Sequence, residues 1–210
     1  MKTKMRLLTG HSKSARERAA ILKNGVYQLK VVLARSRPSI WRRVLVPGDY
    51  TLAALHNVLQ RVMGWSDSHL HEFDIQSVRY GRPAPEIEFY EEELLNESRA
   101  RLRHVLPAAG KSFKYIYDFG DNWVHDIKVE KVLARDEGAV YPFCLGGENA
   151  CPPEDCGGIF GYYDKLEIIK DPSHQDYEDI ADWIGEFDPA LFSIEAVNRS
   201  LRALSGKRAR

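Results

Sequence analysis

The chain has 210 residues and no net charge, and it is 44% hydrophobic and 29% charged, which is ordinary for a soluble globular protein of one domain. No apolar run approaches the roughly 20 residues of a membrane span, and the basic start lacks the apolar segment of a signal peptide. Three cysteines do not make a secreted disulfide framework, so we expect a cytoplasmic protein.

Residues 1–25 are predicted to form a basic appendage that contains a short helix. Ser14 and Glu17 have the spacing of a helix capping box, which indicates a helix over residues 12–24. The apolar side of this helix is thin, so we expect it to lie outside the main domain.

The next segments alternate between strand and helix patterns. Residues 26–34 and 40–46 predict two strands, and the short turn between them predicts antiparallel pairing. A helix is expected to begin at Thr51, because apolar residues then recur at the helical period, and to end at Gly64. Residues 69–76 predict a further strand.

Residues 112–133 predict a β-hairpin at the centre of the fold, with a tight turn at residues 120–122. Alternate side chains of each strand share one face, and this face is rich in aromatic residues. It needs a partner layer, so we expect the rest of the chain to pack on it. The residues of the face are Phe113, Tyr115, Tyr117 and Phe119 in the first strand, and Trp123, His125, Ile127 and Val129 in the second.

The C-terminal third is predicted to be helical after an irregular loop. Residues 144–158 contain prolines and glycines that argue against regular structure there. Three helices are expected next, over residues 162–170, after a cap at Ser173 and after a cap at Ser193.

Strands early and helices late predict an α+β fold. We expect a single two-layer domain over residues 26–204, with a mostly antiparallel sheet and a central hairpin packed by helices. A basic tail of residues 205–210 follows it.

Five short motifs occur in a characteristic order. They are Ile40-Trp-Arg-Arg-Val44, Met63-Gly-Trp65, Ser68-His-Leu-His-Glu-Phe73, Tyr117-Asp-Phe-Gly-Asp121 and Ala150-Cys-Pro-Pro-Glu-Asp-Cys-Gly-Gly158. In this order they resemble the plasmid pRiA4b ORF-three-like family, over about residues 26–204. The resemblance implies a compact α+β domain from bacteria, archaea or their mobile elements, and little about activity. Some relatives carry a transposon-resolvase label, but the activated serine and arginine cluster of a serine recombinase is not apparent in this sequence.

Several polar residues are candidates for one pocket. His69 and His71 are expected on one side of a strand, and His125 on the aromatic face of the hairpin. If these strands are neighbours, three imidazoles converge near aspartates, which suits a metal site or an acid–base pair. The alternative is a seam of core histidines satisfied by hydrogen bonds. The predicted pocket residues are His69, His71, Asp118, Asp121, Trp123 and His125.

The three cysteines are candidates for a structural zinc site. Cys144, Cys151 and Cys156 would supply thiolates, with His174, or else His125, as the fourth ligand. Zinc would explain how a loop rich in proline and glycine becomes ordered. The other interpretation is that the thiols are small buried side chains and that backbone hydrogen bonds fix the loop.

The charges are unevenly distributed. Residues 1–24 carry seven Lys or Arg and one Glu (+6), and residues 195–210 carry five Lys or Arg and one Glu (+4), which leaves −10 for residues 25–194. The basic ends, including Arg16 and Arg18, indicate either nucleic-acid contact or solvated tails.

Arg42 and Arg43, beside Trp41, are further candidates for nucleic-acid contact, or else solvated arginines of an edge strand. The acidic body argues against a broad phosphate-binding surface.

Two functional hypotheses follow from the sequence. The first is a non-enzymatic binding or accessory module, associated with mobile genetic elements or nucleic acid, whose polar pocket binds an unidentified protein, nucleic-acid or other partner. The second is a metal-dependent hydrolase, with zinc as the expected cofactor, that uses the same histidines and aspartates.

Overall fold

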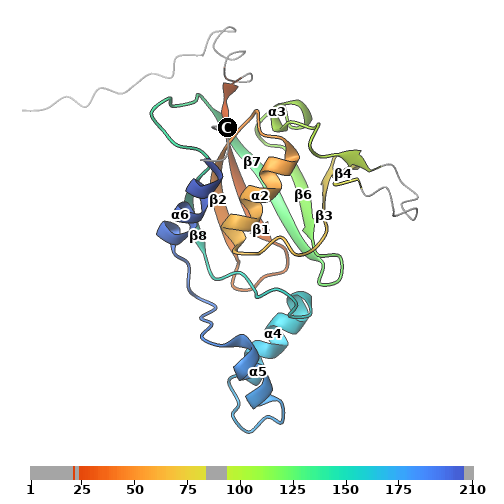
Figure 1. Cartoon of the computed structure of the whole chain (residues 1–210), viewed down its shortest axis with the longest axis vertical. Helices are drawn as coiled ribbons and strands as arrows, with labels where there is room; N and C mark the ends of the chain where they lie inside the picture. Colours follow the sequence, from red (N-terminus) through yellow and green to blue (C-terminus); the bar gives the residue numbers. More distant parts are fainter. Residues whose placement is uncertain (1–20, 22–23, 84–93, 206–210) are drawn as a thin grey trace, which may run out of the picture.

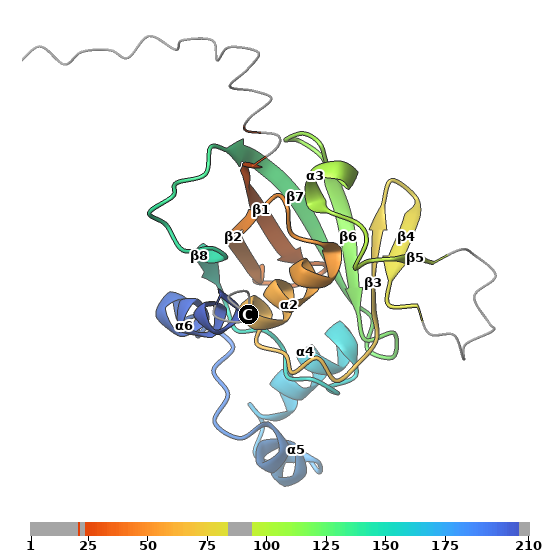
Figure 2. The same ribbon diagram turned by 45° about the horizontal axis from the view of Figure 1, so that its top comes forward.

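The computed structural model describes residue 21 and residues 24–83 and 94–205 of the chain. Its framework is one eight-stranded sheet, with α2 lying across one face (Figure 1, Figure 2). The strands are β1 (Val26–Leu33), β2 (Trp41–Pro47), β3 (His71–Ile75), β4 (Val78–Gly81), β5 (Leu95–Asn96), β6 (Ser112–Tyr117), β7 (Trp123–Leu133) and β8 (Phe143–Glu148). The helices are α2 (Leu52–Met63), α3 (Leu102–Val105), α4 (Gly158–Ile168), α5 (Tyr177–Ile184) and α6 (Ile194–Ser205). The predicted α+β class is therefore confirmed.

The predicted hairpin lies in the middle of the sheet. The strand order is β5-β4-β3-β6-β7-β1-β2-β8, and every neighbouring pair is antiparallel except β4 with β5. Across the hairpin, Tyr115 lies opposite His125 and Tyr117 lies opposite Trp123, with all four side chains in the core. The prediction for Phe119 was wrong: this side chain is 43% exposed, because it belongs to the loop between the strands, where alternation no longer applies.

Helix α2 covers the apolar face of the sheet. As predicted, the Thr51 hydroxyl caps its first turn by accepting a hydrogen bond from the Ala54 N–H at 3.2 Å. Gly64 ends the helix in the left-handed region, with φ 97°, as glycine readily can. The side chains that α2 buries include Leu52, Leu55, Val58, Leu59 and Val62.

Part of the segment that we expected to be irregular is the strand β8. Cys144 lies opposite Val44 of β2, and the register shifts before Gly146, which lies opposite Arg43. A Cβ atom added to Gly147 would lie 2.7 Å from the Trp41 carbonyl oxygen, so only glycine fits so close to β2. The glycines therefore allow this strand to pair, and the prediction was wrong for residues 144–148.

Helix α6 covers the outer edge of β8. The Asn198 side-chain oxygen accepts a hydrogen bond from the Cys144 N–H at 2.8 Å, and its NH₂ group donates to the Cys144 carbonyl at 3.0 Å. Ser193 caps the helix as predicted, by accepting from the Ala196 N–H at 3.2 Å. One amide side chain thus forms the two hydrogen bonds that a neighbouring strand would form.

The helices that precede α6 differ in detail from the prediction. Helix α4 begins at Gly158, four residues before the expected start. Ser173 does not cap α5, which begins after Asp176 without a side-chain cap. The Ser173 hydroxyl instead donates to Asp171 Oδ1 at 2.6 Å, and this bond keeps it within the turn before α5.

Arg42 is buried, with 2% of its surface exposed, so the prediction that it contacts nucleic acid was wrong. The side chains of β2 alternate, and this one points into the core, where α2 and β8 meet. Its guanidinium donates to four backbone carbonyl oxygens at 2.8 to 2.9 Å, those of Trp41, Val62, Glu148 and Asn149.

The terminal predictions lie almost wholly outside the described residues. They concern the helix over residues 12–24, with Arg16 and Arg18, and the tail over residues 205–210. The domain limits of 26 and 204 remain predictions. Within the described ranges, no helix has the length and the apolar content that a bilayer crossing requires.

We expect Arg42→Lys to lower the free energy of unfolding by about 3 kcal/mol, because lysine leaves some of the four buried carbonyls without a donor. Urea unfolding measures this change. Arg43→Lys is the matched control: Arg43 forms a partly exposed pair with Glu130, and its substitution should cost less than about 1 kcal/mol. Equal losses in the two variants would contradict the structural role of Arg42.

Candidate functional site

The six residues predicted to form one pocket lie in three separate places. The expected convergence of three imidazoles was wrong, because His69 precedes β3 and does not continue its alternation into the core. The three places hold Trp123 with His125 in the core, His71 stacked on His56, and His69 with Asp118 and Asp121 at one end of the sheet.

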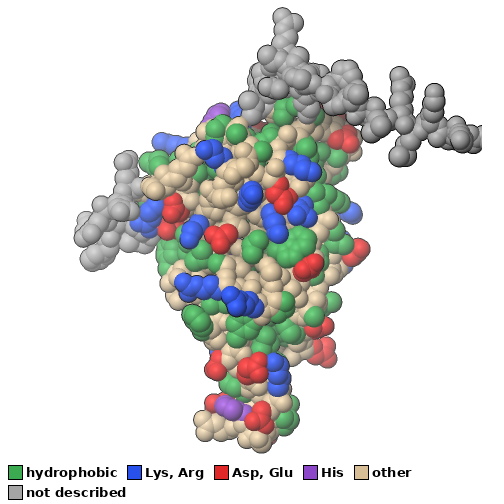
Figure 3. Space-filling view, turned by 180° about the vertical axis from the view of Figure 1, so that it is seen from behind, with side chains coloured by type: hydrophobic (Ala, Val, Ile, Leu, Met, Phe, Trp, Pro, Cys, Tyr) green, Lys and Arg blue, Asp and Glu red, His purple; other side chains and the backbone are tan. Residues whose placement is uncertain are grey.

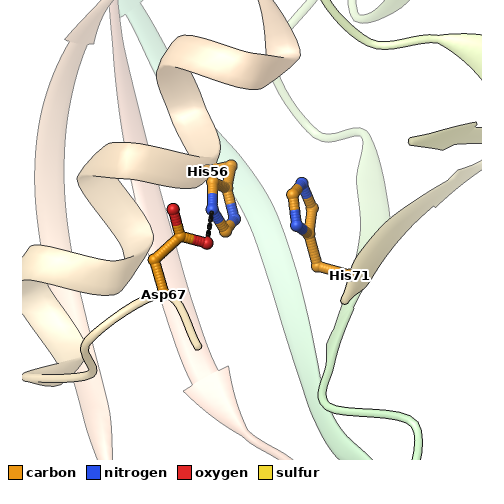
Figure 4. Close-up of side chains that lie close together, drawn as sticks. All are labelled: His56, Asp67 and His71. Carbon is orange, nitrogen blue, oxygen red and sulfur yellow. Dashed lines mark hydrogen bonds and ion pairs between the residues drawn. The ribbon is translucent and has the colours of Figure 1, made fainter. Parts of the chain in front are cut away.

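The second place is a buried stack of two histidine rings, one from α2 and one from β3 (Figure 4). The ring centroids of His56 and His71 are 3.5 Å apart, and their planes differ by 6°. His56 Nδ1 lies 2.8 Å from the Tyr115 hydroxyl, and its Nε2 lies 2.8 Å from Asp67 Oδ1. His71 Nε2 lies 2.8 Å from a carboxylate oxygen of the buried Glu97. The stack therefore has a carboxylate partner for each ring.

This stack is a hydrogen-bonded part of the core and not a metal site. His56, Asp67 and His71 do offer possible ligand atoms within 4.8 Å of one another. However, nitrogen lone pairs lie in the ring planes, and two nearly parallel planes do not direct them at one ion. Both nitrogens of His56 already have partners. Burial, and then the neighbouring His71, lower the pKa of His56 to about 4, so this ring is neutral at pH 7.

His125 also belongs to the core. Its Nδ1 lies 3.2 Å from the Tyr115 carbonyl oxygen, and its Nε2 is buried without a hydrogen-bond partner among the described residues. Trp65 packs against the ring edge-on, with centroids 5.2 Å apart. Burial lowers the pKa of His125 to about 4, so it is a neutral, structural histidine.

The third place is the candidate functional site. His69, Asp118 and Asp155 offer possible ligand atoms that all lie within 4.8 Å of one another. His69 Nε2 lies 3.2 Å from Asp155 Oδ1 and 3.7 Å from Asp118 Oδ2. It nevertheless forms no hydrogen bond with either oxygen, although the atom itself is shielded from solvent. The Asp155 side chain is 72% exposed, so the cluster opens to solvent on that side.

Local backbone turns fix the two aspartates of this site. Asp118 follows β6 with φ 56°, and its Oδ1 accepts hydrogen bonds from the N–H groups of Gly120 at 2.9 Å and Asp121 at 3.3 Å. These bonds leave Oδ2 on the side of His69. Asp155 has φ 59°, and aspartate tolerates this left-handed conformation better than most residues.

Glu154 fixes the loop that carries Asp155. Its carboxylate accepts hydrogen bonds from the hydroxyls of Ser66, Ser68 and Tyr117. Burial alone would raise the pKa of Glu154, but hydrogen bonds from Ser66 and Tyr117 outweigh it and lower that pKa. Burial, followed by the contact with Glu154, raises the pKa of Tyr117 to about 12, so the phenol stays protonated and donates.

Two more contacts attach the same loop to the segment after α2 and to the loop between β6 and β7. The Trp65 Nε1–H donates to the Pro152 carbonyl at 3.1 Å. The Gly157 N–H donates to Asp121 Oδ2 at 3.2 Å, so Asp121 anchors the loop. A Cβ atom added to Gly158 would lie 2.5 Å from the Asp121 carbonyl oxygen, and Gly158 has φ 69°, so only glycine fits there.

The predicted cysteine zinc site is not assembled. Within residues 24–83 and 94–205, no cysteine belongs to a group of three possible metal ligands that lie close together. Burial raises the pKa of the thiols of Cys144, Cys151 and Cys156, the last to about 12, and all three are free. His174 instead accepts a hydrogen bond from the Asp176 N–H at 3.1 Å. The structure fits the interpretation of small, inert thiols.

Sequence reasoning missed Asp155 and Glu154 as site residues, and it did not pair His56 with His71. The signal for the two acids was their place in the motif between Cys151 and Cys156. Nothing in that motif tells which other segment the acids approach, because the approach depends on the tertiary path of an irregular loop.

The sequence matches, over residues 25–196, the family described as plasmid pRiA4b ORF-3-like protein. The uncharacterized protein y4hQ of Sinorhizobium fredii (strain NBRC 101917 / NGR234) is 38% identical over 188 residues, which are 88% of this chain and 95% of that protein. The crystal structure of the protein of unknown function MM3350 from Methanosarcina mazei Go1 is similar with a TM-score of 0.72 and 39% identity. The similarity covers 82% of this chain and 97% of that one.

We expect His125→Gln to make stability less dependent on pH. The pKa of His125 is about 4 in the folded protein and about 6.5 when unfolded, so the unfolded chain takes up the proton first as the pH falls. In the unchanged protein, His125 therefore contributes on the order of 3 kcal/mol to the free energy of unfolding above pH 6.5. This contribution is lost as the pH falls from 6.5 toward 4. Urea unfolding at pH 7.5 and pH 4.5 measures the difference. The exposed His174→Gln is the control, and an unchanged pH dependence in His125→Gln would contradict the assignment.

We expect Glu154→Ala to free the loop of residues 151–158, because three hydroxyl donors lose their acceptor. Amide hydrogen exchange in this loop should become at least about tenfold faster, which corresponds to about 1.4 kcal/mol of local stability. Exchange in β6 and β7 should not change. Glu148→Ala, at an exposed side chain just before the loop, is the control and should leave both rates as they are.

Proposed function

The chain belongs to the plasmid pRiA4b ORF-3-like family, and we propose that it is a binding module whose site holds a divalent metal ion between His69, Asp118 and Asp155. The observation that carries this proposal is the shielded His69 Nε2, which lies near two carboxylate oxygens without forming a hydrogen bond to either. Buried polar atoms normally have a partner, and an ion between the three side chains would give this nitrogen the partner that neither carboxylate supplies.

The spacing of the three side chains supports zinc or a similar first-row ion. Nitrogen and oxygen ligands lie about 2.0 to 2.2 Å from zinc, so at tetrahedral angles two ligand atoms lie roughly 3.3 to 3.6 Å apart. The two distances from His69 Nε2, 3.2 and 3.7 Å, bracket that range. Imidazole with two carboxylates is also a ligand set that zinc accepts.

The proposed site has an open side toward solvent. Three protein ligands would leave a fourth position, and the exposure of Asp155 supports access of a partner group to the proposed ion. The ion would then bind an oxygen or nitrogen donor of that partner. Three free thiols support a reducing, cytoplasmic setting for this binding.

The same open position favours metal-dependent hydrolysis as a second candidate function. A metal with three protein ligands can hold a water molecule in the fourth position and lower its pKa. Turnover of nitrophenyl phosphate or nitrophenyl acetate by the zinc-loaded protein, abolished in Asp155→Asn, would favour the hydrolase. Zinc binding without turnover favours the binding module.

We expect the metal-stripped full chain to bind about one zinc ion, measured by elemental analysis after dialysis and by calorimetric titration. His69→Ala and Asp155→Asn should each weaken binding at least tenfold, because each removes one of three ligands. His174→Ala is the control and should bind as the unchanged protein does. Absence of stoichiometric binding would contradict the proposal, and so would a loss in Cys156→Ser that His69→Ala does not reproduce.

A further inference from the structure

The face of the sheet opposite α2 carries no helix in the part of the chain that the structure describes. Figure 3 shows this face, where several lysine and arginine side chains lie over the middle of the sheet with some Asp and Glu side chains among them. The outward side chains of β1, β2, β6 and β7 include five basic residues and Trp41. We call this set the basic sheet face: Lys30, Trp41, Arg43, Lys114, Lys128 and Lys131.

Three of its cations lie side by side across three strands. Lys30 of β1 is directly opposite Arg43 of β2 on one side and Lys128 of β7 on the other. Adjacent strands are about 4.8 Å apart, and like charges opposite each other destabilise a sheet. Among the described residues, neither Lys30 nor Lys128 lies within ion-pair distance of a carboxylate. Glu130 is hydrogen-bonded to Arg43 and to the Gln28 amide, and its charge also acts on Lys30. The Glu130 carboxylate and the Trp41 ring offset part of the repulsion within this row, and a polyanionic ligand would offset the rest.

The row adjoins an aromatic ring. The Lys30 Nζ lies 5.4 Å from the centre of the Trp41 ring, and the Arg43 guanidinium carbon lies 5.2 Å from it. Trp41 is partly exposed on an otherwise open β-sheet. Proteins that bind single-stranded nucleic acid on a sheet combine an aromatic side chain, on which a base stacks, with cations that contact the phosphates.

The charge distribution favours a polyanion over an apolar or neutral partner. Residues 25–194 carry a net charge of −10, yet the outward side chains of β1, β2, β6 and β7 carry five cations against Asp126 and Glu130. The outward side chains of the neighbouring strand β3 include Glu72 and Asp74, and Asp74 lies directly opposite Lys114, so the excess of cations lies over β1, β2 and β7. Residues 1–24, which precede β1 in the sequence, carry a net charge of +6. The acidic body therefore does not argue against a local phosphate-binding surface.

We propose that the basic sheet face binds single-stranded nucleic acid, with a base stacked on Trp41 and phosphates contacted by Lys30, Arg43 and Lys128. This site is separate from the proposed metal site: none of its residues is a metal ligand or contacts one. In this proposal the nucleic acid contacts Trp41 and Arg43, the outward-facing neighbours of Arg42, and not Arg42 itself, which is buried.

Fluorescence anisotropy of the full chain with a labelled 15-nucleotide oligo(U) RNA and oligo(dT) DNA, in 50 mM salt, tests this proposal. Trp41→Ala should weaken binding about tenfold, because a base loses its stacking partner, and Trp41→Phe should retain most of the affinity. Lys30→Glu with Lys128→Glu should weaken it at least tenfold and reduce its dependence on salt. Tighter binding of RNA than of DNA would add recognition of the 2′-hydroxyl, and equal binding would assign the affinity to stacking and phosphates.

The controls separate this face from the rest of the chain. Lys170→Glu with Arg199→Glu makes the same charge change at exposed residues away from the basic sheet face and should not alter binding. Deletion of residues 1–24 and 205–210 should leave binding that remains sensitive to Trp41→Ala. Circular dichroism establishes that each variant is folded. Absence of binding, equal affinity for a duplex of the same length, or affinity that disappears with the ends and ignores Trp41→Ala would each overturn the proposal.

Discussion

The buried guanidinium of Arg42 is the interaction on which the rest of the structure depends. A cation in the core without a carboxylate partner among the described residues must satisfy its N–H donors on carbonyl oxygens, and it finds four. The four carbonyl groups belong to Val62 near the end of α2, to Trp41 of β2, to Glu148 at the end of β8 and to Asn149, the next residue. Because all four must stay in place together, Arg42 fixes the point at which the chain leaves the sheet after β8. The path of residues 150–158 starts from that fixed point.

The candidate site exists only because this loop returns to the end of the hairpin. Glu154 accepts hydrogen bonds from residues on both sides of the site, and Asp121 accepts one from Gly157. Each contact is modest, but together they place Asp155 beside His69. The site thus combines side chains from three segments that are distant in the sequence, none of which forms a site alone. Glu154 and Asp121, which are not among the three proposed ligands, therefore help to fix its geometry.

The sequence predicted best where one local rule decides the structure. Side-chain alternation identified the hairpin faces, and capping chemistry placed both ends of α2 at Thr51 and Gly64. It failed where tertiary contacts decide: glycines suggested irregular structure at β8, although close packing against Trp41 requires one of them. Alternation also made His69 a companion of His71, although the strand begins only at His71. The position of Asp155 depends on a long-range path that no local pattern encodes.

The hydrogen bonds between Asn198 and β8 have a consequence for the behaviour of the protein in solution. An open edge strand offers a row of N–H and C=O groups on which other chains can assemble into aggregates or fibres. Here one amide of α6 occupies both groups of Cys144 in the short strand β8. At the opposite edge, β5 is only two residues long and gives little template. Both edges are therefore poor seeds for polymerisation, which suits a protein that presents one wide, exposed sheet face to its surroundings.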